Sequence, residues 1–130
     1  MDWPDNDPRP AAVVELAPEA ALARVARAAA AACCATAGFS VDRLADVRLV
    51  VDEVFNVLVV VGVGPIRLRL VPEYDTVDLE MSATRRDDRG WRLGEFEIVR
   101  LLTDVTADRA SFEDHHGRLS LTARFGVAPI

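Results

Sequence analysis

Residues 40–61 read SVDRLADVRLVVDEVFNVLVVV, a run that predicts one long helix. Ser40 can cap this helix, because a serine hydroxyl accepts hydrogen bonds from the free N–H groups of the first turn. The segment GVGP at 62–65 ends it. Apolar residues recur at spacings of three and four, which makes one continuous apolar face: Leu44, Val47, Val51, Val54, Leu58 and Val61. The polar side carries the adjacent carboxylates Asp52 and Glu53, which are typical of a solvated face or of a functional site.

Alternating apolar and polar residues in IRLRLV (66–71) and VDLEMSA (77–83) predict the two strands of a β-hairpin. Weaker patterns predict further strands at 13–16, 104–112 and 118–125, and further helices at 19–37 and 94–103. Both helices are expected to turn apolar residues inward: Leu22, Val25 and Cys33 on the first, and Phe96, Val99 and Leu102 on the second. Helices would then cover one face of a mainly antiparallel, mixed sheet, so the order predicts an α+β fold, a two-layer α/β sandwich.

Composition indicates one globular domain. The chain has 130 residues, of which 51% are hydrophobic and 28% charged, values typical of a soluble domain. We expect a disordered N-terminal tail at 1–10, a single domain at 11–126 and a C-terminal tail at 127–130. The net charge of −6 argues against nucleic acid or an anionic membrane as partner, because both attract basic surfaces.

The sequence also favours a cytoplasmic protein. Its longest apolar run, at 57–66, is too short to span a bilayer, and the acidic, proline-rich start lacks the positive region of a signal peptide. Cys33 and Cys34 are adjacent and cannot link distant segments, so we expect packed free thiols rather than a disulfide framework. His115 and His116 are the only histidines, and we expect no metal site there.

The chain resembles the anti-sigma regulatory factors of the RsbW/SpoIIAB type, in their actinobacterial, mycobacterial-like branch. The resemblance covers residues 13–125 and is clearest in FSVDRLADVRLVVDEV (39–54), in the two hairpin strings, in GEFEIVRLLTDV (94–105) and in GRLSLTARF (117–125). It implies the histidine-kinase-like (GHKL) ATPase fold and a homodimer that binds a sigma factor and keeps it from RNA polymerase. Many members also use Mg-ATP to phosphorylate a serine of a STAS-domain anti-anti-sigma factor.

The central nucleotide motif of that family is altered in this chain. The family carries E-x-x-x-N, in which the Glu positions or deprotonates the nucleophile and the Asn ligates Mg²⁺. Glu53 matches the Glu, but Val57 stands in the Asn position and offers no oxygen to a hard cation. Asn56 lies one residue earlier on the same side of the helix, so it is the candidate replacement ligand.

The other two nucleotide motifs are displaced or reduced. The family's D-x-G box, whose Asp accepts from the adenine amino group, is expected at 83–84, where the chain has Ala and Thr; D-x-G occurs only later, at 88–90. Gly94, before the third predicted helix, is all that remains of the glycine-rich phosphate loop. Because positioning and charge stabilisation are nearly all that such a kinase supplies, we expect ATP and Mg²⁺ binding to be weak or lost and kinase activity to be absent.

Three residues are candidates for partner binding. Arg24, in LARV (22–25), matches a first-helix arginine that in the family contacts both the sigma factor and its antagonist, and a planar guanidinium binds carboxylates bidentately. The alternative is an exposed arginine without a partner. Arg27 extends the same surface by one turn. Trp91 is either an anchor for a partner or a plug that folds over the former nucleotide cleft.

The leading hypothesis is therefore an anti-sigma factor that regulates transcription by sequestering a sigma factor. The alternative is a serine/threonine protein kinase of a STAS-domain anti-anti-sigma factor, which would use Glu53 and Asn56 in an altered site. A third possibility is a regulator that binds only that antagonist.

Overall fold

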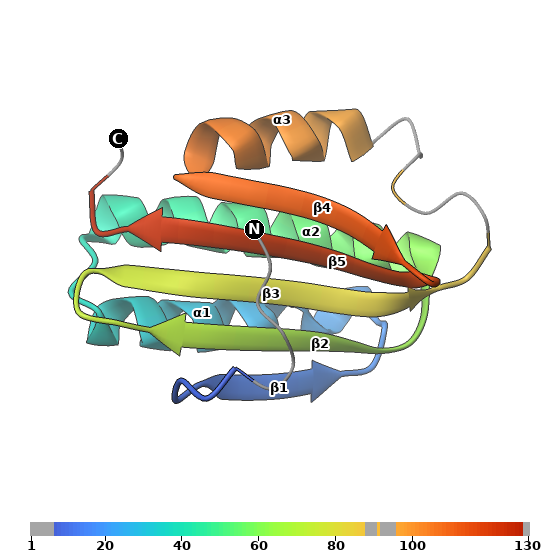
Figure 1. Cartoon of the computed structure of the whole chain (residues 1–130), viewed down its shortest axis with the longest axis horizontal. Helices are drawn as coiled ribbons and strands as arrows, with labels where there is room; N and C mark the ends of the chain where they lie inside the picture. The colour runs from blue at the N-terminus through green and yellow to red at the C-terminus, as the bar shows by residue number, and fades with distance from the viewer. Residues whose placement is uncertain (1–6, 88–90, 92–95, 129–130) are drawn as a thin grey trace.

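The computed structural model describes residues 7–87, 91 and 96–128. These form five strands, three α-helices and one short 3-10 helix (Figure 1): β1 (Ala12–Leu16), η1 (Ala20–Leu22), α1 (Ala23–Thr36), α2 (Val41–Val61), β2 (Gly62–Pro72), β3 (Thr76–Arg85), α3 (Phe96–Thr106), β4 (Arg109–His115) and β5 (Arg118–Gly126). The predicted long helix is α2, and the predicted hairpin is β2–β3, so both predictions are confirmed. No helix of the described residues is long and apolar enough to cross a membrane.

The strands form one antiparallel sheet in the order β1-β2-β3-β5-β4. Helices α1 and α2 lie together behind this sheet in Figure 1, and α3 lies beside β4 and contacts α2. The α+β prediction is confirmed, but the prediction of a mixed sheet is wrong, because every pairing of the described strands is antiparallel. Three elements, η1, α1 and α2, lie between β1 and β2, and α3 and β4 lie between β3 and β5. In both cases the chain returns to the end of the sheet where the first strand stopped.

Helix α2 is the centre of the packing. The hydroxyl of Ser40 accepts a hydrogen bond from the backbone N–H of Arg43 at 3.1 Å, as the predicted cap requires. The predicted apolar face is buried apart from half-buried Leu44, and Val50 and Phe55 widen it. At its end α2 passes directly into β2 at Gly62. A Cβ there would lie 2.6 Å from the carbonyl oxygen of Leu58, which only glycine avoids.

The buried face of α1 differs from the prediction. Its buried residues are Ala23, Ala26, Ala30 and Cys34, whereas Val25 is 39% exposed. The prediction failed because α1 is a run of alanines, in which neighbouring arcs of the helix are almost equally apolar. Small side chains on the buried arc let α1 pack closely against α2 and β2.

The C-terminal half departs from the prediction at one boundary. The strand predicted at 104–112 begins too early, because α3 continues to Thr106 and β4 runs from Arg109 to His115. Inside α3, Thr103 is buried where Leu102 was expected, and its hydroxyl donates to the carbonyl oxygen of Val99 at 2.8 Å. A β-branched threonine can therefore continue this helix, since its polar group is satisfied by the preceding turn.

Residues 7–10 pack on the outer face, which is the side of the sheet opposite α1 and α2. The guanidinium of Arg9 donates to Asp78 and to Glu73, both at 2.5 Å, and the carboxylate of Asp7 accepts from Arg69 at 3.4 Å. Asp78 alternates with the core residues of β3, yet its side chain is only 1% exposed. Residues 7–10 belong to the segment that the sequence predicts to be a disordered tail, and residues 1–6 lie outside the described part of the chain.

Candidate functional site

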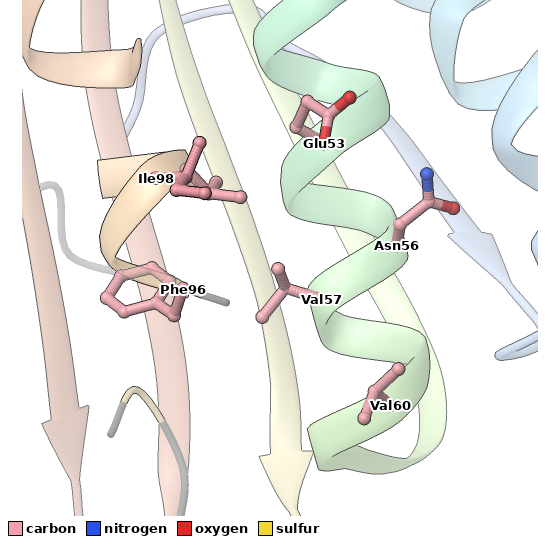
Figure 2. A pocket seen from close by; sticks show the side chains of 7 residues that line it. Glu53, Asn56, Val57, Val60, Phe96 and Ile98 are labelled. Atoms are coloured by element: carbon pink, nitrogen blue, oxygen red, sulfur yellow. The ribbon is translucent and has the colours of Figure 1, made fainter. Parts of the chain in front are cut away.

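An open cavity of about 460 Å³ lies between α2 and α3. Helix α2 supplies one carboxylate, one amide and two valines, and α3 supplies three apolar side chains (Figure 2): Glu53, Asn56, Val57 and Val60, and Phe96, Ile98 and Val99. A cavity of this size with apolar walls and few polar groups is typical of a binding site.

The cavity brings together two of the predicted site residues. Glu53 and Asn56 both line it. In Figure 2, however, the amide of Asn56 projects from α2 on the side away from α3, whereas Val57 points toward Phe96 and Ile98. An isopropyl group therefore occupies the position between the two helices. Gly94 and the D-x-G string at 88–90 lie outside the described residues.

Adjacent carboxylates on α2 serve different sides of that helix. Glu53 lines the cavity next to α3, whereas Asp52 forms an ion pair with Arg27 of α1. The guanidinium of Arg27 is thus held against α2, next to a shallow hollow that is also lined by Arg48 and Leu49. Arg24 is exposed on the outside of α1. The structure therefore places both predicted arginines on α1, and it places Glu53 and Asn56 at the α2–α3 cavity.

Trp91 belongs to an aromatic cluster behind the cavity wall. Its ring stacks on Phe96 with 4.8 Å between centroids and meets the edge of Phe112 at 5.3 Å. Its indole N–H donates to the carbonyl oxygen of Glu113 at 2.8 Å. With only 8% of the residue exposed, Trp91 does not present its ring to a partner. Trp91 folds back onto the chain, as in the alternative of a plug, but it packs behind Phe96 and is not among the residues that line the cavity.

Arg43 positions α3 and was missed by the sequence analysis. It is 2% exposed, and it donates to the carbonyl oxygens of Thr106 at 2.7 Å and Gly126 at 2.9 Å and to the carboxylate of Asp108 at 3.0 Å. A cation that meets the last carbonyls of a helix stabilises its C-terminus. Arg43 therefore joins the start of α2 to the end of α3 and the end of β5, whereas the cavity lies toward the other end of both helices. The only signal in the sequence is an arginine at a core-facing position of α2.

The two cysteines lie on α1, and the two histidines lie at the surface. Burial raises the pKa of the Cys34 thiol to about 12, and it also raises the pKa of half-buried Cys33, so both thiols are protonated at neutral pH. His115 and His116 are exposed beside the β4–β5 turn. No group of three His, Cys, Asp or Glu side chains suited to a metal occurs within the described residues.

Comparison of the sequence with protein-family models found no match, and neither did comparison with curated proteins.

Proposed function

We propose that this chain is an anti-sigma factor, a cytoplasmic binding protein that sequesters an RNA polymerase sigma factor and has weak or lost ATP binding. The proposal assigns the α+β sandwich to the histidine-kinase-like ATPase fold and includes the homodimer, as the sequence resemblance implies. Sigma-factor binding rests on the sequence resemblance. The observation that carries the loss of ATP binding is the apolar wall formed by Val57, Phe96 and Ile98, because Val57 stands where that family has its Mg²⁺ ligand.

The described lining of the cavity does not suit Mg-ATP. Magnesium takes oxygen ligands in near-octahedral geometry, but Val57 has no oxygen and the amide of Asn56 lies on the far side of α2. Phosphate oxygens need cations or N–H donors, whereas Glu53 is the one charged residue in the described lining. A carboxylate beside a polyphosphate would repel it. These mismatches favour a protein that binds its partner without phosphotransfer.

We place the sigma-factor contact on α1, around Arg24. This arginine is exposed and, within the described residues, is in no ion pair, so its guanidinium can meet carboxylates of a partner. Arg27 is less suited to lead that contact, because its ion pair with Asp52 must first be broken. The chain's net charge of −6 makes local basic groups on α1 the natural place for an acidic segment to bind.

Calorimetry with ATP, with and without Mg²⁺, tests the first half of the proposal. We expect no Mg²⁺-dependent heat and no thermal shift at millimolar nucleotide. A ligand at a hundred times its dissociation constant would add about 2.7 kcal/mol to the free energy of unfolding, which a thermal scan detects easily. Micromolar, Mg²⁺-dependent binding, together with phosphate transfer to a STAS-domain protein, would instead establish the kinase alternative with Glu53 and Asn56 in its site.

Binding assays against the sigma factors of the encoding genome test the second half. Arg24→Glu should weaken the complex by at least about tenfold, because it replaces a cation with an anion at the interface. Arg109→Glu, on exposed β4, is the matched control and should leave affinity unchanged. Equal affinity of both variants would remove Arg24 from the interface. Binding of a STAS-domain protein alone, with no sigma factor, would support the third hypothesis and contradict the proposal.

A further inference from the structure

Helix α3 presents apolar side chains to solvent as well as to the core. Ile98, Leu101 and Val105 are 74%, 66% and 73% exposed. Their spacing of three and four places them on one side of the helix, where they form a stripe. This stripe extends for about 10 Å at a rise of about 1.5 Å per residue. Single exposed apolar residues are ordinary, but a continuous stripe indicates an interaction surface.

The stripe continues into the cavity. Ile98 belongs to both, and on α2 the cavity ends at Val60, which is itself 56% exposed. We call the stripe and the cavity together the α2–α3 surface. It therefore combines a raised apolar ridge with a hollow that can receive a large side chain, which is the form of a groove that binds an apolar helix face.

Acidic residues border the α2–α3 surface. Glu53 lines the cavity on α2. Glu97 and Asp104 lie about two turns apart on the polar side of α3, next to Leu101. The one basic residue of α3, Arg100, lies over the rings of Phe96 and Phe112, at 5.1 and 5.3 Å from their centroids. The charge that borders the apolar stripe is therefore mainly negative.

This charge pattern selects among occupants. If α3 packed antiparallel on α3 of a second copy, Glu97 and Asp104 would follow the same edge in both chains and face each other. Like charges across such a seam are destabilising. An anionic membrane would meet the same repulsion. A helix that has apolar residues on one face and Lys or Arg beside them can pack on the apolar stripe and also pair with the acidic residues that border it.

We propose that the α2–α3 surface binds a basic amphipathic helix of a partner protein. The largest apolar side chain of that helix enters the cavity next to Val57 and Phe96, and smaller ones pack along Ile98, Leu101 and Val105. Its basic residues pair with Glu53, Glu97 and Asp104. This surface is separate from the Arg24 contact on α1, so the inference does not depend on the proposed sigma-factor complex.

Fluorescence polarisation with the full chain tests the proposal. The probe is a labelled peptide of about 20 residues, with leucines on one helical face and lysines beside them, stapled on its polar side. We expect micromolar binding. Two matched peptides separate the contributions: one has glutamates in place of lysines, and one keeps the lysines but has serines in place of leucines. Both should bind at least about tenfold more weakly.

Variants of the chain locate the site. The double substitution Ile98→Gln with Leu101→Gln should weaken binding of the basic peptide by at least about tenfold, and Glu97→Gln with Asp104→Gln should weaken it and flatten its salt dependence. Tyr74→Ser is the control, because Tyr74 is 95% exposed in the distant β2–β3 turn. Arg24→Glu should also leave peptide binding unchanged, which separates this inference from the α1 contact.

Four results would overturn the proposal. The first is that the basic peptide does not bind at 100 times the expected micromolar concentration. The second and third are that the acidic peptide or the serine peptide binds as tightly as the basic leucine peptide. The fourth is that the Ile98/Leu101 variant binds the basic peptide as tightly as the wild type. Sedimentation would assign the surface to a second copy if the chain is a dimer that the Ile98/Leu101 variant breaks. Flotation with vesicles of phosphatidylserine would assign it to a membrane if the wild type binds and that variant does not.

Discussion

The outer face of the sheet and the α2–α3 surface both border the core, but they differ in which side chains they leave exposed to solvent. On the outer face, buried Asp78 is held by Arg9 and Arg124. On the α2–α3 surface, Ile98 keeps 74% of its area in water. Charged groups of the outer face are thus satisfied within the chain, by residues 7–10 among others. The apolar groups of the α2–α3 surface are not, so a partner has more free energy to gain there.

Removal of the ring that joins the α2–α3 surface to the core should have the largest effect. Phe96 is fully buried and packs against Trp91 and Phe112. Phe96→Ala should lower the free energy of unfolding by about 4 kcal/mol, because it leaves a cavity and ends both ring contacts. Urea unfolding measures this loss. Ile98→Ala on the same helix is the control and should change stability by less than about 0.5 kcal/mol; equal losses would mean that α3 packs by its other face.

On the outer face, Asp78→Ala should be the most damaging substitution. It leaves two guanidinium groups without their shared carboxylate, and loss of one partner of a buried ion pair costs about 3 kcal/mol or more. Since the side chains of Arg9 and Arg124 are 27% and 35% exposed, water can replace part of the interaction, and we expect about 2 kcal/mol. Asp104→Ala, on exposed α3, should lower stability by less than about 0.5 kcal/mol. A loss for Asp78→Ala as small as for Asp104→Ala would show that the outer face is not held by this pair.

A pH series separates the two regions further. Hydrogen bonds from the side chain and backbone of Arg9 hold the pKa of Asp7 well below its usual range. A depressed carboxyl pKa stabilises the fold fully above the unfolded value of about 4, and this contribution is lost as the pH falls toward the native value. Asp7→Asn should therefore be less stable than wild type at pH 6, and the two should converge as the pH is lowered below about 4. An Asp7→Asn difference that stayed constant with pH would contradict this linkage.

The smallest effect on stability is expected at the α2–α3 surface itself. Leu101→Gln should change the free energy of unfolding by less than about 0.5 kcal/mol, because the leucine is already 66% exposed. Thermal unfolding in the absence of any partner measures this. A clear loss of stability would mean that Leu101 is covered in solution by the chain itself or by a second copy.

The fold was predictable where the signal is local. Ser40 as a cap, the apolar spacing of α2 and the alternation in β2 and β3 each reside in neighbouring residues. By contrast, the buried arc of α1 depends on which alanines meet α2, and the end of α3 depends on Arg43, which is distant in sequence from Thr106. Neither contact leaves a periodic pattern in the chain.

The candidate site was predictable on only one side. Glu53 and Asn56 were predicted from the resemblance to the E-x-x-x-N motif, and both line the cavity. The opposite wall, from Phe96 to Val99, comes from a helix whose apolar residues look like ordinary core. Sequence spacing correctly placed Phe96 and Val99 on the inward face, but it could not show that this end of α3 borders a cavity with α2, because that depends on how the two helices pack.

The strand order has a consequence for how the molecule reaches its native state. The β2–β3 and β4–β5 ladders are hairpins that can form early, because their strands are neighbours in the chain. The β1–β2 and β3–β5 ladders join strands separated by α1 and α2, or by α3 and β4, and closing such long loops costs chain entropy before contacts compensate for it. We therefore expect the docking of β1 on β2 and of β5 on β3 to be slower than the formation of the two hairpins. Until β5 docks on β3, the edges of both hairpins that meet in the native sheet are open to pairing with other chains.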